Sequence, residues 1–263
     1  MLNALIIIIV LLAFAYLISQ VIQKSGVSSN TGVSPNKGGV TEEKYIEFHF
    51  DDSDKTEGEY LVADIETTGL PIKRKTKPED FDNWPYIVQI GWLLFDNEGK
   101  CIELKHYVIN QNIDIPKDSV AIHGITNEIA KEKGVSPKIA YTDFVNAIKK
   151  ANKFISHNTD FDVPIIGCEL LRNGFENHLI HKKNICTMKR GKNFCQLEGY
   201  EGDYKYPKLQ ELYLKCFYPG FDTIKIKEYA NLDGNLPNKA LIDAAMAAKC
   251  FFKLKELNII KDR

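Results

Sequence analysis

An apolar run that carries two carboxylates on one side, LVADIETTGL over residues 61–70, constrains this chain more than any other feature. Successive side chains of a β-strand alternate between its two faces, so Asp64 and Glu66 project to the same side while their apolar neighbours can be buried. Burial of unpaired carboxylates is costly, and oxygen ligands of this kind suit Mg²⁺ or Mn²⁺. A D-x-E pair also occurs on solvated strand faces and in ion pairs near turns, so these two residues alone leave both interpretations open.

Length and charge limit the classes of protein that the chain can belong to. Its 263 residues suffice for one well-packed domain of roughly 200 residues with an appendage. The formal net charge of −1 excludes a generally basic nucleic-acid-coating protein, although it is compatible with a local basic patch. The six cysteines form no C-x-x-C pair, which favours reduced, mostly buried thiols in a reducing compartment over a zinc site or a disulfide framework.

The N-terminal stretch over residues 2–22 is uncharged and, at about 20 residues, long enough to cross a bilayer as a helix. A signal peptide and a buried core helix are the alternatives. No Lys or Arg precedes the run, which exceeds the usual apolar region of a signal peptide, and it is apolar all round and abuts a linker. We therefore expect a single-pass membrane anchor over residues 1–23 and a flexible linker over 24–42. Lys24 follows the span and places the folded domain in the cytoplasm.

The remaining chain shows an α/β pattern with a mixed sheet. Alternating hydrophobicity predicts strands that join the first one in an antiparallel meander, with a hairpin signal at 96–100 between them and a further strand later in the chain. The predicted strands are 86–95, 101–109 and 152–157, with a short edge strand within 42–59. Helical spacing predicts helices at 128–133 with Thr126 as N-cap, 137–151, 163–172 with Pro164 in its first turn, 208–216 and 239–257.

Two further acids lie where these elements can direct them at the first pair. Asp162 stands at the start of the helix that follows the strand at 152–157, and Asp243 stands in the first turn of the C-terminal helix. An Asp at such a position is also an ordinary cap or dipole partner. The cations of the segment PIKRKTK at 71–77 follow the acidic strand, where they form either a solvated loop or contacts to phosphate.

Three motifs, taken in order, favour a common metal site over ordinary helix caps and solvated charges. They are ADIETTG around Asp64 and Glu66, SHNTDFD ending at Asp162, and NKALIDA around Asp243. They resemble the three motifs of the DEDD superfamily of 3′-to-5′ exonucleases, the group that contains the proofreading epsilon subunit and ribonuclease T. The resemblance covers residues 58–257 and includes connecting segments at 83–92, 122–126 and 185–212. It implies an exonuclease-like domain over 43–263 with a ribonuclease H-like fold, in which helices flank a mixed five-stranded sheet.

The resemblance also implies the roles of individual residues. It makes the four acids metal ligands and places Thr67, Thr68 and Leu70 near the terminal nucleotide, with His123 in the substrate loop. An Asn suits loops that close through side-chain hydrogen bonds, so Asn158 is a candidate for holding the active-site loop. For both His123 and Asn158, a purely structural role is an equal alternative.

The four acids suit a two-metal reaction. Two divalent ions, Mg²⁺ or Mn²⁺, that lie about 4 Å apart can activate water and stabilise the leaving 3′-oxygen in attack on a phosphodiester. Four carboxylates offset most of the positive charge of such a pair. The resemblance supplies the substrate, which is single-stranded or 3′-terminal DNA or RNA.

One position departs from the family pattern. In the histidine branch a His lies five residues before the last Asp and acts as general base, and in the tyrosine branch a Tyr lies four before it; this chain has Asn238 and Lys239 there. An Asn amide cannot accept a proton near neutral pH, and general-base catalysis typically contributes about 10²-fold to 10⁴-fold. We therefore expect an exonuclease with weakened turnover, with a catalytically impaired nucleic-acid-binding or scaffold protein on the same fold as the alternative. His157, beside Asn158, is a further candidate for the missing base.

Overall fold

The structure is a computed structural model that describes residues 58–73, 75–217 and 239–261. The predicted anchor at 1–23, the linker at 24–42 and nearly all of the predicted edge strand within 42–59 lie outside these residues. Within the described part of the chain, no helix is both long enough and apolar enough to span a membrane.

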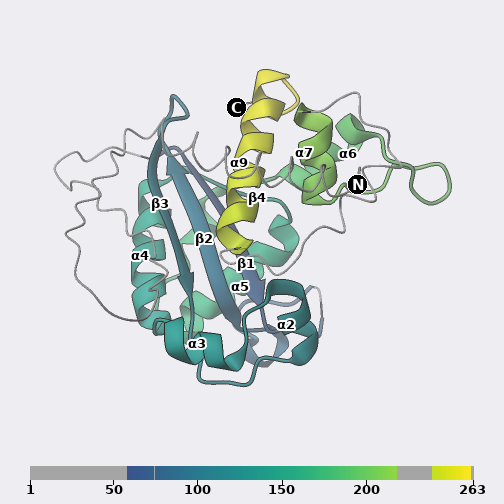
Figure 1. The fold of residues 1–263 in the computed structure, drawn as a ribbon. Coiled ribbons are helices and arrows are strands. Elements are labelled where there is room, and N and C mark those ends of the chain that lie inside the picture. The colour runs from purple at the N-terminus through teal and green to yellow at the C-terminus, as the bar shows by residue number, and fades with distance from the viewer. Residues whose placement is uncertain (1–57, 74, 218–238, 262–263) are drawn as a thin grey trace, which may run out of the picture.

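Five strands form one mixed sheet in the order β3-β2-β1-β4-β5 (Figure 1). The first three are antiparallel neighbours, whereas β4 runs parallel to β1 and β5 runs parallel to β4. This topology confirms the predicted meander and the mixed five-stranded sheet. The strands are β1 (Tyr60–Thr67), β2 (Ile87–Phe95), β3 (Cys101–Val108), β4 (Lys153–Ser156) and β5 (Lys183–Cys186).

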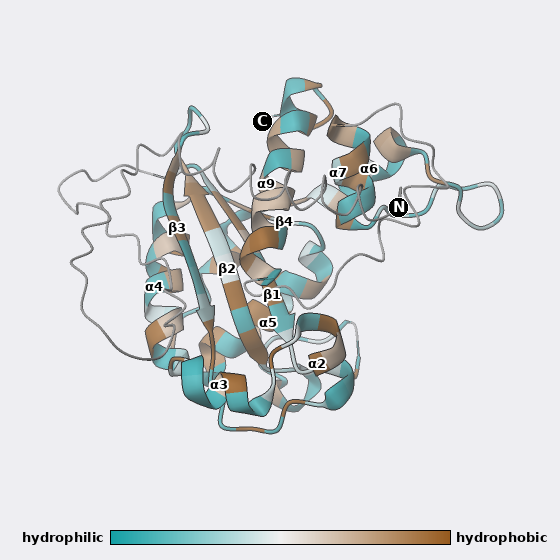
Figure 2. Cartoon of the chain, in the orientation of Figure 1, coloured by the Kyte–Doolittle hydropathy of each residue, from teal (hydrophilic) through white to brown (hydrophobic). Residues whose placement is uncertain are grey.

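Helices cover both faces of the sheet. The helices are α2 (Lys117–His123), α3 (Asn127–Lys133), α4 (Pro137–Lys150), α5 (Thr159–Arg172), α6 (Thr187–Cys195), α7 (Leu209–Phe217) and α9 (Lys239–Glu256), with short 3₁₀ turns η1 (Phe81–Asn83) and η2 (His178–His181). The two largest cores pack α4 and α5 against one face of the sheet and α9 and α7 against the opposite face, and a smaller core lies around Val88, Ile115, Ile125 and Ala130. All nine residues of β2 are buried between these layers, and Figure 2 shows most of this strand in the brown of hydrophobic residues.

The helix predictions differ from the structure mainly at α5. The Thr126 side chain caps α3 as expected, by accepting a hydrogen bond from the backbone of Ile129 at 3.2 Å. However, α5 begins at Thr159 rather than at residue 163, because the carbonyl of Asn158 already accepts hydrogen bonds from two backbone N–H groups of the next turn. Pro164 therefore lies in the second turn of α5, and its predicted place in the first turn is wrong. Helices α2 and α6 and strand β5 are not among the predicted elements.

Gly91 of β2 lets the start of α9 lie directly against the sheet. It pairs with Asp64 across the β1–β2 ladder. A Cβ at Gly91 would lie 2.4 Å from the backbone nitrogen of Leu241, so no larger side chain fits there without a shift of the helix. Beside it, the side-chain oxygen of Gln89 accepts a hydrogen bond from the backbone N–H of Ala240 at 2.9 Å. The first turn of α9 is thus held at the part of β1 that carries the acids.

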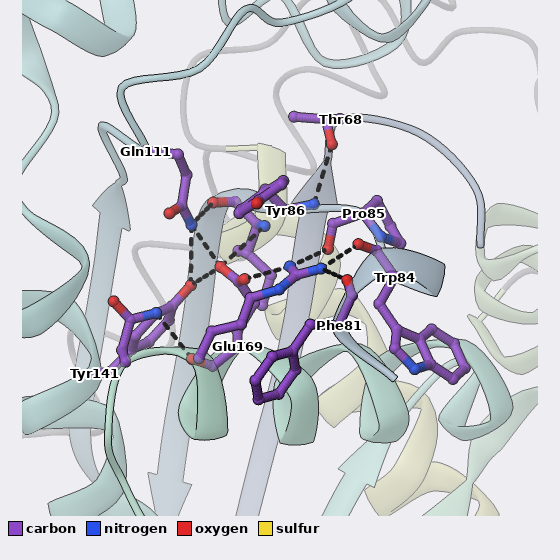
Figure 3. Close-up of polar contacts among 11 residues, drawn as sticks. Thr68, Phe81, Trp84, Pro85, Tyr86, Gln111, Tyr141 and Glu169 are labelled. Carbon is purple, nitrogen blue, oxygen red and sulfur yellow. Dashed lines mark hydrogen bonds and ion pairs between the residues drawn. The ribbon is translucent and has the colours of Figure 1, made fainter. Parts of the chain in front are cut away.

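A buried ion pair on the other face holds the chain between β1 and β2 (Figure 3). The carboxylate of Glu169 on α5 is completely buried. It accepts hydrogen bonds from the Tyr141 hydroxyl at 2.6 Å, from the Gln111 amide at 2.5 Å and from Arg172 at 2.7 Å. The charge is therefore balanced and well supplied with donors, which is what a buried ion requires.

Arg172 extends this network to the entrance of β2. Its guanidinium donates to the carbonyl oxygens of Phe81, of Trp84 at 2.5 Å and of Pro85 at 3.2 Å, and lies 4.1 Å from the centre of the Tyr86 ring. The backbone of Tyr86 in turn exchanges two hydrogen bonds with Thr68, at 2.9 Å and 3.0 Å. The pair thereby sets the position of the turn that follows the acidic strand.

Substitution of Arg172 by Met should destabilise the protein by about 3–5 kcal/mol, because it leaves the Glu169 charge buried without its partner. Urea unfolding followed by the fluorescence of the two tryptophans, Trp84 and Trp92, which are both buried, measures this loss. Lys189→Met is the control, since it removes an exposed pair with Asp160 and should cost less than about 1 kcal/mol. Similar losses in the two variants would contradict the prediction.

Candidate metal centre

Three of the predicted metal ligands meet at one point between β1 and α9. Asp64 and Glu66 project from the same face of β1, and Asp243 projects from α9. Each offers a carboxylate oxygen, and these oxygens all lie within 4.8 Å of one another. Oxygen ligands in this number and at this spacing fit a divalent cation of the Mg²⁺ or Mn²⁺ type.

The fourth predicted ligand, Asp162 on α5, is buried beside this group. Burial raises the pKa of Asp162 to about 7, and the negative charge of Glu66 adds to the rise. Burial also holds the pKa of Asp64 well above its ordinary value, with the charges of Asp243, Asp162 and Glu66 acting in the same direction. The four carboxylates therefore share one electrostatic site, and a cation among them would relieve their repulsion.

Lys239 supplies such a cation from the protein itself. Its ammonium group donates hydrogen bonds to Glu66 at 2.8 Å and to Asp243 at 2.6 Å. Burial by itself lowers the pKa of Lys239, but the negative charges of Asp243, Glu66 and Asp64 outweigh it and hold the pKa above the ordinary value. In the sequence, Lys239 stands out only as the residue at the tyrosine position of the family pattern. The signal that points to its contact is the four-residue spacing to Asp243 on one helix face.

Asn238, at the position of the family's general base, and His157, the further candidate for that base, have different outcomes. Asn238 lies outside the described residues, so its role stays a prediction. His157 is a structural residue, because its Nδ1 faces the Thr187 hydroxyl and its Nε2 faces the Pro207 carbonyl, each at 3.0 Å. Burial lowers the pKa of His157 to about 4, so the ring is neutral at physiological pH. Both ring nitrogens are engaged, and His157 does not replace the missing base.

The predicted substrate residues after β1 lie in a tight turn. Thr67 donates its hydroxyl to the carbonyl of Gly69 at 2.7 Å, and Thr68 pairs with the backbone of Tyr86. Leu70 is 80% exposed and follows directly, so a large apolar side chain stands free beside the acids. The structure thus brings these residues together at the acidic end of β1, and contact with a nucleotide stays a prediction.

His123 and Asn158 have clearer structural roles than the sequence could assign. The Nδ1 atom of His123 accepts a hydrogen bond from the backbone of Ile125 at 3.1 Å, while its buried Nε2 has no partner among the described residues. The Asn158 side chain makes no capping hydrogen bond to α5. Its backbone carbonyl accepts from the N–H groups of Phe161 and Asp162 instead, so the expected side-chain contact is replaced by a main-chain one.

The chain matches known exonuclease domains in sequence. Residues 61–216 match the family model described as RNase_T, exonuclease. DNA polymerase III subunit epsilon of Rickettsia felis is 34% identical over 110 residues, which cover 42% of this chain and 43% of that protein. The 3′-5′ exonuclease DinG of Bacillus subtilis is 29% identical over 152 residues, which cover 58% of this chain and 14% of that protein. The chain therefore spans less than half the length of these curated relatives.

Solved structures show the same fold. E. coli exonuclease I in complex with a dT13 oligonucleotide superimposes with a TM-score of 0.54 at 17% sequence identity, over 75% of this chain and 40% of that protein. The zinc-bound form of the same enzyme with single-stranded DNA gives a TM-score of 0.53 at 16% identity, over 75% of this chain and 40% of that protein. At these identities the likeness establishes the arrangement of the sheet and helices.

The raised pKa of Asp162 predicts how the stability of the metal-free protein depends on pH. An ordinary Asp has a pKa near ~3.9. Between that value and about 7, folded Asp162 binds a proton that the unfolded chain releases. Stability should therefore fall as pH rises through this window, by up to ~1.4 kcal/mol per pH unit for one group. Asp162→Asn, which is neutral throughout, should flatten this slope in urea unfolding with EDTA present.

Two comparisons isolate the effect of Asp162. Neutral, buried His157 makes the protein lose stability as pH falls below about 6.5, but it does so equally in the parent and in the variant. Asp143→Asn is the control and should leave the slope in this window unchanged. Lys105 and Tyr107 hydrogen-bond Asp143 in the ionised form and keep its pKa low despite partial burial. Parallel pH profiles for the parent and Asp162→Asn would show that Asp162 does not titrate in this window.

Proposed function

The chain belongs to the RNase_T exonuclease family, and on that premise we propose that it is a metal-dependent 3′-to-5′ exonuclease that hydrolyses phosphodiester bonds at the 3′ ends of nucleic acids. The observation that carries the proposal is the convergence of Asp64, Glu66 and Asp243, whose oxygens lie within 4.8 Å of one another. A protein that only binds nucleic acid has little need to hold repelling carboxylates together, whereas a hydrolase that uses divalent cations requires them.

The acids provide positions for two divalent ions, Mg²⁺ or Mn²⁺. Asp64, Glu66, Asp162 and Asp243 would together hold them. When bound, such ions lower the pKa of coordinated water and stabilise the leaving 3′-oxygen. The residues of this chain orient the site: β1 fixes the first two acids, and the clamp of Gln89 on the start of α9 fixes the third.

The substrate would be the 3′ end of a single strand of DNA or RNA. The structures of exonuclease I were determined with dT13 and other oligonucleotides, and the epsilon relatives are named as DNA polymerase subunits. Beside the acids of this chain, Leu70 and Ile72 expose most of their apolar surface and can stack on or separate terminal bases. Exposed Lys73, Lys75 and Lys77 follow and can contact the phosphates.

An assay with 3′-labelled and 5′-labelled single-stranded DNA and RNA, in Mg²⁺ or Mn²⁺, tests the activity. We expect stepwise shortening from the 3′ end that Asp64→Asn abolishes and that Asn238→His accelerates, by at most about 10²-fold to 10⁴-fold. Asp143→Asn, on α4, is a control that should leave the rate unchanged. If neither the parent nor Asn238→His shortens any substrate while both still bind it, the chain is the impaired nucleic-acid-binding protein of the alternative.

We also propose that residues 1–23 anchor this domain to a membrane and that the linker at 24–42 leaves it on the cytoplasmic side. The support is the uncharged stretch over 2–22 with Lys24 behind it. The full chain should sediment with membranes and require detergent for release, whereas a chain that begins at residue 41 should not. A soluble full chain in the absence of detergent would refute the anchor, and a periplasmic reporter signal from a C-terminal fusion would refute the orientation.

A further inference from the structure

The acidic centre holds a cation that belongs to the chain. The Lys239 ammonium lies 2.8 Å from a Glu66 oxygen and 2.6 Å from an Asp243 oxygen, and these two residues supply two of the three carboxylates of the metal centre. A divalent ion would need the same carboxylates at roughly 2.1 Å for Mg²⁺. An ammonium group that already bridges them leaves no room for a second cation, and its charge repels one.

The surroundings show that this contact is more than a surface ion pair. The Lys239 side chain is only 12% exposed, and those of Glu66 and Asp243 are 9% and 11% exposed. Lys239 is also the first residue of α9, where the helix dipole disfavours a positive charge. A lysine there is stabilised by the carboxylates and not by its place in the helix. The clamp of Gln89 and the close approach at Gly91 keep the start of α9 at this point.

We propose that Lys239 is a resident cation of the site, which pairs with the Glu66 and Asp243 carboxylates in the metal-free protein and which a divalent ion must displace in order to bind there. The inference rests on the proposed metal-dependent function and adds a way in which metal binding is regulated. Electrostatic attraction favours the exchange of the ammonium for a divalent ion, because two positive charges then replace one among three carboxylates. The flexible four-carbon stem of lysine allows the ammonium to swing away without a movement of the helix.

This exchange has two consequences. The metal affinity of the site is lower than its three carboxylates alone would provide, so occupancy responds to the concentration of free divalent ion. The metal-free protein is also protected from the repulsion of its own acids, which would otherwise favour unfolding. Lys239 is therefore a regulating residue of the metal centre.

The test is Mn²⁺ binding to the full chain in mild detergent, measured by calorimetry for the parent and for Lys239→Met, which keeps an unbranched side chain, one atom shorter, and removes its charge. We expect Lys239→Met to bind Mn²⁺ at least tenfold more tightly and to unfold at a lower temperature without metal. Lys105→Met is the matched control, because Lys105 pairs with Asp143 at 2.8 Å away from the acids and should change neither quantity. Equal or weaker Mn²⁺ binding by Lys239→Met would overturn the proposal.

A second measurement uses the parent alone and does not depend on how the variant folds. Acetylation by an N-hydroxysuccinimide ester, followed by mass spectrometry, reports the accessibility of each lysine. Saturating Mn²⁺ should speed modification of Lys239 severalfold and leave Lys105 unchanged. If Mn²⁺ binds but Lys239 stays protected, the exchange is wrong and the proposed exonuclease stands. If Mn²⁺ binds neither the parent nor Lys239→Met, the metal centre itself is wrong and the exchange falls with it.

Discussion

Carboxylates whose oxygens lie within 4.8 Å of one another repel, and the packing around them has to hold them together against that repulsion. Strand β1 does so for Asp64 and Glu66, which pair with Gly91 and Gln89 of β2. Asp243 depends on a helix far along the chain, which reaches β1 only because the residue opposite Asp64 is Gly91. The absence of a side chain at one position of β2 thus allows the third acid to join the first two.

Charge is treated differently on the two faces of the sheet. On one face the buried Glu169 carboxylate is matched by Arg172 and further donors, as expected for a group that serves stability. On the other face Asp64, Glu66 and Asp243 exceed the single positive charge of Lys239. Burial first, and the repulsion among the acids second, raise the pKa values of Asp64 and of Asp162 on α5. Local imbalance of this kind is typical of functional sites. The two regions are linked, since the network around Arg172 holds Tyr86 and, through it, Thr68 beside the acidic strand.

Much of the fold could be predicted because its central elements carry clear periods. The two-residue period of the first three strands and the helical spacing of α4 and α9 gave their positions to within one or two residues. The predicted start of α5 lies four residues late, because the main chain at Asn158 already begins the helix. Strand β5 has four residues, of which two are exposed, and so carries almost no pattern.

What the sequence determined by itself was the identity of the acids and the common side of Asp64 and Glu66, because strand geometry alone directs residues two apart to one face. The tertiary structure decided which other groups share their space. It brought Lys239 into contact with Glu66, which is 173 residues away in the chain, and it engaged both nitrogens of His157 with Thr187 and Pro207. The physical reason is that pairing between distant charges depends on how a helix packs on a sheet, and that packing is set by contacts such as the one at Gly91, which no local pattern encodes.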